Sequence, residues 1–142
     1  MDMETFKMIH SELIMWMQYV EQDLRIIYAT LMPGNYSDNY DVVGKASLGR
    51  LVKELQAMDE EVGYSKFKPA DYETLKQIKD IRNYWCHQCF LDFHYIENPV
   101  EHERKFQELA TRIHYDENRV YDLYQKIEKL RKGVVKKHKN GR

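Results

Sequence analysis

Residues 75–89 have the sequence LKQIKDIRNYWCHQC, in which apolar side chains recur every three or four positions. That spacing places them on one face of an α-helix. No Gly or Pro interrupts the stretch, so nothing in its interior opposes a helical backbone. The stretch therefore predicts an amphipathic helix with one buried face, formed by Leu75, Ile78, Ile81, Trp85 and Cys89.

The same helical spacing appears in other parts of the chain. A long stripe of apolar residues predicts a helix at about residues 4–31, and a shorter stripe predicts one at about 46–58. The helix that contains residues 75–89 is predicted to start near residue 71. The apolar spacing that predicts it is lost between residues 93 and 96. A last helix runs from about residue 99 to beyond 130. Four main helices are therefore expected.

Turn and capping residues separate these segments. A cluster of Pro, Gly, Asn and Ser predicts a loop at residues 32–41, and a second break falls at 63–69. Asp71 has a side chain suited to cap the third helix. Asn98 followed by Pro99 is typical of a helix start, with Asn as the cap and Pro at the first helical position.

The predicted fold class is all-α, an up-and-down bundle of four main helices in a single domain spanning residues 1–142. No stretch shows the sustained alternation of a β-strand. The final segment, 131–142, contains six Lys or Arg residues and little periodicity. We expect it to be a basic tail, either frayed in solvent or attracted to RNA phosphates.

Composition limits the classes of function. The net charge of −1 gives no overall attraction for nucleic acid, although it allows local basic patches. No segment has the run of about 18 apolar residues that crosses a membrane, so we expect no membrane partner. Two cysteines do not form a disulfide framework, and the expected location is the cytoplasm.

Arg82 has an unusual position on the predicted third helix. With 100° per residue, it falls within or beside the apolar stripe, where a guanidinium costs several kcal/mol unless partners satisfy it. Asn83 and His87 are four residues apart and share another face, roughly 100–140° around the helix. Lys79 lies beside them. These four side chains are the candidate site.

The chemistry that fits these residue types is RNA cleavage without a metal. RNA carries its own nucleophile, the 2′-hydroxyl. An imidazole titrates near neutral pH, so His87 can serve as a base or an acid. Arg82 can hold phosphate oxygens and stabilise developing charge, with Asn83 and Lys79 in support. Because these groups diverge around one helix, two copies meeting across a twofold axis would make a better site.

Simpler interpretations remain open. An Arg and a His five residues apart occur together often by chance. Arg82 then contacts an acidic neighbour, and His87 is an ordinary surface residue. The Cys86–Cys89 pair suggests a metal site, but structural zinc needs about four ligands and the chain has no second cysteine pair. We therefore expect neither a metal nor another cofactor.

The run Arg82-Asn83, three residues, then His87, on the third helix of a four-helix bundle of this length, resembles the HEPN superfamily (higher eukaryotes and prokaryotes nucleotide-binding). The resemblance implies a metal-independent endoribonuclease of a toxin–antitoxin or abortive-infection system. It also implies a homodimer in which two copies of the motif face one cleft, with Arg82 and His87 catalytic. A non-catalytic member would instead bind a nucleotide, RNA or a protein through the same cleft.

One position departs from a subgroup of that family. Toxins silenced by a minimal nucleotidyltransferase partner carry a Tyr two residues after the His, and this chain has Cys89 there. Nucleotidylation of a tyrosine at that position is impossible here. The resemblance therefore implies either a stand-alone protein or a different antitoxin or regulatory protein.

Overall fold

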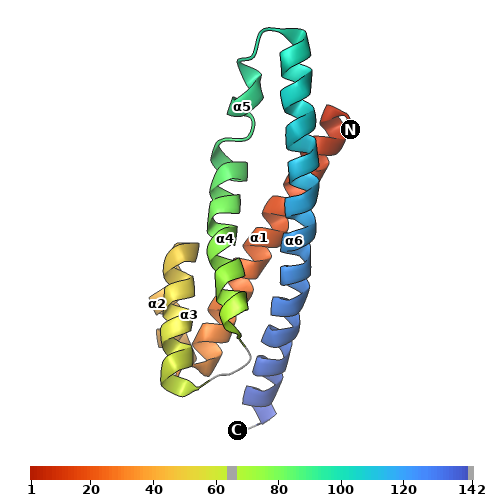
Figure 1. The fold of residues 1–142 in the computed structure, drawn as a ribbon. Helices are drawn as coiled ribbons and strands as arrows, with labels where there is room; N and C mark the ends of the chain where they lie inside the picture. The colour runs from red at the N-terminus through yellow and green to blue at the C-terminus, as the bar shows by residue number, and fades with distance from the viewer. Residues whose placement is uncertain (64–66, 141–142) are drawn as a thin grey trace.

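A computed structural model of the chain describes residues 1–63 and 67–140. Within these residues every regular element is a helix, which confirms the predicted all-α class. Six helices are found where four were expected, because two short helices were not predicted (Figure 1). They are α1 (Met3–Leu31), α2 (Tyr36–Val43), α3 (Leu48–Val62), α4 (Pro69–His87), α5 (Leu91–His94) and α6 (Pro99–Asn140).

Helix α1 forms the central support of the fold. Its start is capped by Asp2, whose carboxylate accepts a hydrogen bond from the backbone N–H of Thr5 at 2.7 Å. Its end, just before Pro33, agrees with the predicted boundary. The pairing of α1 with α6 is the most extensive of the molecule, and α1 also contacts α2, α3 and α4 (Figure 1).

The predicted loop at residues 32–41 is wrong, because α2 occupies most of it. Asn35 acts as a helix cap here and accepts a hydrogen bond from the backbone N–H of Asp38. The amide of Asn39 donates to the carbonyl of Met32 at 2.8 Å, which ties α2 to the end of α1. Residues typical of turns are also typical of helix starts, and the sequence alone did not separate the two roles.

Helix α3 begins and ends a few residues later than predicted. Ser47 caps its start, and Gly63 ends it in a left-handed conformation with φ of 66°. Gly49 lies where α3 meets α4: a Cβ placed there would be 3.3 Å from the side chain of Lys79. The glycine therefore lets the stem of that lysine lie close to α3.

Helix α4 begins at Pro69, and its cap is Lys68, not the predicted Asp71. Asp71 is in the first turn, where its carboxylate accepts a hydrogen bond from the backbone N–H of Lys68 at 2.9 Å. The helix ends at His87, earlier than predicted. The separate short helix α5 follows after three residues.

The early end of α4 has a visible cause. The side chain of His10 on α1 donates from Nε2 to the carbonyl of Trp85 at 2.7 Å. In a continuing helix that carbonyl would accept from the backbone N–H of Cys89. This N–H bonds instead to the carbonyl of Tyr84 at 3.0 Å. A residue distant in sequence therefore helps to end the helix.

Helix α6 starts as predicted: Asn98 accepts hydrogen bonds from the backbone N–H groups of Val100 and Glu101, at 3.0 and 3.1 Å. The expectation of a frayed tail after residue 130 is wrong, because α6 continues to Asn140. Val134 is buried one turn beyond Leu130 and extends the apolar stripe. None of the described helices is long and apolar enough to cross a membrane.

Candidate functional site

Arg82 lies on the side of α4 that faces α1. Its guanidinium nitrogen Nη1 is 2.9 Å from Oε1 of Glu21, a side chain that is only 6% exposed. The other carboxylate oxygen of Glu21 is 3.7 Å from Arg25. The prediction that Arg82 is not a free surface arginine is confirmed, and its partner comes from another helix.

Glu21 depends on its two arginines for its charge. Burial raises the pKa of Glu21 above its ordinary value, while the positive charges of Arg82 and Arg25 oppose that rise. Burial is the largest of these effects, so the pKa of Glu21 stays raised. Loss of either arginine would make an ionised Glu21 less favourable.

The two arginines beside Glu21 have different surroundings. Arg25 donates to the backbone carbonyls of Val43 and Ala46, each at 3.1 Å, and so joins α1 to the connection between α2 and α3. Arg82 makes no such backbone bond among the described residues, and its side chain remains 39% exposed. Arg25 is engaged in structure, whereas Arg82 is oriented by a carboxylate and still accessible to a ligand.

The other three candidate residues lie on the exposed part of α4. Asn83, His87 and Lys79 are all exposed. Within the described part of the chain, Asn83 and His87 make no hydrogen bond or ion pair. The exposed amide and imidazole, one helical turn apart, are therefore free to contact a ligand. The stem of Lys79 packs over Gly49, which places this lysine beside α3.

One chain does not bring Arg82 and His87 to a common point. Five residues of helix separate them by about 7.5 Å along the axis and about 140° around it. Arg82 faces α1, while His87 is at the exposed end of α4. The structure thus groups Asn83 with His87 and leaves Arg82 on a neighbouring side of the helix.

The last turn of α4, which carries His87, is held from two sides. The Trp85 carbonyl is bound by His10, whose ring packs edge-on against Phe90 at 5.1 Å between centroids. The indole N–H of Trp85 donates to the buried carboxylate of Asp116 on α6 at 2.8 Å. These contacts fix the backbone that positions His87.

A second polar cluster joins α4, α5 and α6. The guanidinium of Arg112 lies 3.7 Å from the ring centroid of Tyr84, and the hydroxyl of Tyr84 donates to Asp92 at 2.6 Å. Burial, together with the hydrogen bond and charge of Asp92, raises the pKa of Tyr84. A phenol held neutral in this way is a poor nucleophile. This cluster therefore serves to dock the helices.

The sequence did not reveal Glu21. A signal for it was present, because Glu21 follows Met17 by four residues and adjoins Val20 in the apolar stripe of α1. An acid inside such a stripe needs a buried cation. Arg82 has the same kind of position on its own helix. Two opposite charges, each misplaced in an apolar face, are a reason to expect a pair.

The two cysteines, Cys86 and Cys89, lie in different environments. Cys86 is exposed, whereas Cys89 is buried and donates from Sγ to the carbonyl of Trp85. Burial raises the pKa of the Cys89 thiol to about 11, which disfavours the thiolate that binds metals. Among the described residues, no group of three or more His, Cys, Asp and Glu side chains could hold a metal ion.

Comparison of this chain with protein-family models, with curated proteins and with solved structures found no match.

Proposed function

We propose that this protein is a HEPN-type, metal-independent endoribonuclease whose composite site forms between two copies of the chain. The observation that carries the proposal is the state of Arg82. A buried carboxylate orients its guanidinium, yet the side chain remains 39% exposed. An unpartnered amide and imidazole lie near it on the same helix. RNA transesterification uses a positioned cation and a general base, and in this proposal the two groups meet at one phosphate only when two copies of the chain come together.

In the proposed reaction, the imidazole of His87 in one copy takes the proton of an RNA 2′-hydroxyl. The 2′-oxygen attacks the adjacent phosphorus, and the bond from phosphorus to the 5′-oxygen breaks. The imidazolium of His87 in the second copy gives its proton to that leaving oxygen. Arg82 stabilises the charge on the phosphate oxygens during the attack. The products are a 2′,3′-cyclic phosphate and a 5′-hydroxyl.

The divergence of the groups on one helix supports a homodimer. A single α4 presents Arg82 and His87 in different directions, so each copy contributes only part of a site. A twofold axis beside the exposed face of α4 would place Asn83 and His87 of both copies opposite one another. In this proposal α1, α3, α4 and α6 correspond to the four helices of a HEPN bundle, and α2 and α5 are additions.

The biological setting that we propose is a toxin or phage-defence system, in the cytoplasm, with RNA as substrate. Lys79 would contact phosphate outside the reacting group. Because Cys89 replaces the tyrosine of one silenced subgroup, control by an antitoxin or regulatory protein would act through contact and not through modification at that position.

A mixing experiment tests the shared site. Wild type and His87→Ala are co-expressed at equal levels, so about one quarter of the dimers contain two wild-type copies. If both imidazoles serve one site, cleavage of a labelled oligoribonucleotide in EDTA falls to about one quarter of the wild-type rate. Independent subunits would give about one half, and that result would contradict a composite site.

A second candidate is a non-catalytic HEPN-like module that binds a nucleotide, RNA or a protein. The ion pair with Glu21 favours it, because the carboxylate already compensates part of the charge of Arg82. A guanidinium compensated in this way stabilises a transition state less than a free one does. The signature of this alternative is RNA binding that depends on Arg82, without any turnover by the wild-type dimer.

A further inference from the structure

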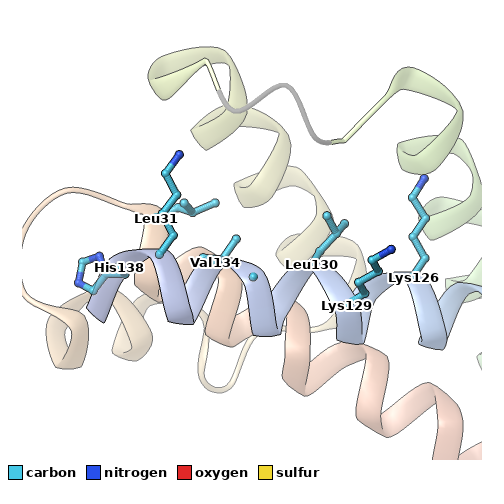
Figure 2. Close-up of a pocket in the computed structure, with 8 residues that line it drawn as sticks. Leu31, Lys126, Lys129, Leu130, Val134 and His138 are labelled. Carbon is cyan, nitrogen blue, oxygen red and sulfur yellow. The ribbon is translucent and has the colours of Figure 1, made fainter. Parts of the chain in front are cut away.

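The C-terminal part of α6 and the end of α1 form an open groove of about 790 Å³ (Figure 2), and none of the four candidate-site residues on α4 lines it. Its apolar surface comes from Leu31 on α1 and from Leu130 and Val134 on α6. The part of α6 that lines the groove runs from residue 126 to residue 138. At 1.5 Å per residue this is about 18 Å, or a little over three helical turns.

Gly133 lies within this groove, and its packing against the described residues does not require a glycine. A glycine inside a helix costs about 1 kcal/mol relative to alanine. A Cβ at residue 133 would meet no atom of a described residue within 4 Å, so close packing against this part of the chain does not require the glycine. Its conformation does not require it either, because its φ is not positive. The glycine leaves a bare stretch of backbone that something outside the described chain can approach.

The rim of the groove carries positive charge that the chain does not neutralise. Lys129 and Lys137 line the groove and make no ion pair with any described residue. Neighbouring cations do have partners, because Lys126 contacts Asp71 at 2.5 Å and Arg131 contacts Asp23 at 2.9 Å. The complementary ligand therefore has apolar groups at its centre and acidic groups to one side and at one end.

We propose that this groove binds an acidic amphipathic helix of a partner protein. Apolar side chains spaced three and four residues apart would rest on Leu130, Gly133 and Val134. A carboxylate beside that stripe would pair with Lys129, and another, at the end nearest the C-terminus of α6, would pair with Lys137. RNA fits less well, because its phosphates gain nothing from an apolar floor. This inference goes beyond the proposed ribonuclease and depends on neither Arg82 nor His87.

The test uses the full chain and a defined probe. A fluorescein-labelled peptide of about 16 residues carries Leu at helical spacing and Glu at its other positions. A second peptide has Lys in place of each Glu. Fluorescence anisotropy should show saturable, salt-sensitive binding of the acidic peptide and at least about tenfold weaker binding of the basic one. Equal binding of the two peptides would overturn the charge argument.

Substitutions at Gly133 then locate the site. The ring introduced by Gly133→Phe would occupy the groove without displacing a described residue. This substitution should weaken binding of the acidic peptide by about tenfold or more. Gly133→Ala is the matched control, because it adds one methyl group and should change the affinity by less than about threefold. Lys129→Glu combined with Lys137→Glu should also abolish binding. Unchanged affinity in Gly133→Phe would contradict the proposal.

Two further outcomes separate the groove from the site on α4. The peptide should bind His87→Ala as it binds wild type, and loss of binding there would place the peptide at the motif and overturn the inference. An unlabelled single-stranded oligoribonucleotide should not displace the peptide. Displacement that is also sensitive to Gly133→Phe would show that the groove takes nucleic acid instead.

Discussion

The guanidinium of Arg82 on α4 lies 2.9 Å from the carboxylate of Glu21 on α1, and the carboxylate is almost fully buried. Arg82 therefore joins two helices, and in the proposed function it also presents charge to a ligand. A simple alanine variant at residue 82 would change the fold and the chemistry together. Experiments on the site have to separate these effects.

We expect Arg82→Ala to lower the free energy of unfolding by about 1–2 kcal/mol, because it leaves Glu21 buried with only Arg25 nearby. This loss is smaller than for a fully buried pair, since Arg82 is partly solvated. Adding Glu21→Gln should recover part of it by removing the unpaired charge. Urea denaturation of wild type, the two single variants and the double variant measures both steps. Additive losses in the double variant would show that the two residues do not interact.

The hydrogen bond from Trp85 to Asp116 should contribute measurably to stability. Trp85→Phe removes the indole N–H and leaves a buried carboxylate whose nearest described cation, Arg112, is 3.9 Å away. The expected loss is about 1–3 kcal/mol, measured by thermal or urea unfolding. Trp16→Phe is the matched control, because Trp16 is only half-buried. Equal losses for the two variants would count against the role of the hydrogen bond.

The carboxyl group of Glu117, which interacts with Glu12, should make stability depend on pH. Burial, with the hydrogen bond and charge of Glu12, raises the pKa of Glu117 from 4.5 to about 7. The folded state then holds this proton more tightly than the unfolded state, so stability falls as pH rises from 4.5 to 7. Glu117→Gln removes the effect and should gain stability relative to wild type across that range.

The measurement for Glu117 is a series of urea unfolding curves at pH 5, 6, 7 and 8 for both proteins. The free energies of unfolding of wild type and Glu117→Gln should diverge as pH rises to about 7. Above that pH their difference should stay constant. Glu60→Gln on the exposed surface of α3 is the control. Its free energy of unfolding should change with pH as that of wild type does. A parallel profile for Glu117→Gln would show that its proton is not held in the folded state.

The sequence predicted those parts of the fold that depend on local signals. The apolar stripe of α1 and the Asn98–Pro99 start of α6 are properties of adjacent residues, and both are confirmed. The end of α4 was misplaced, because His10, about 75 residues away in sequence, takes the carbonyl of Trp85. The helix at Asn35 was missed for another reason, since one side chain suits both a turn and a helix cap.

The candidate site was predictable to the same limited extent. The position of Arg82 in an apolar face required a partner, and that requirement is confirmed. The identity of the partner was not predictable from α4 alone, because it depends on how α1 and α4 cross. The groove beside Gly133 was missed, since it arises only because α6 continues through residues 131–140, which were predicted to be a tail, and lies near Leu31.

His87 gives the most direct test of the proposed ribonuclease, because its exposed, unpartnered side chain can be removed with little effect on folding. Wild type, His87→Ala and the control His114→Ala, another exposed histidine, are incubated with a labelled oligoribonucleotide in EDTA. We predict that wild type and His114→Ala cleave it, and that His87→Ala is slower by about a hundredfold or more. Equal cleavage by His87→Ala, or no cleavage by a confirmed wild-type dimer, would contradict the proposal.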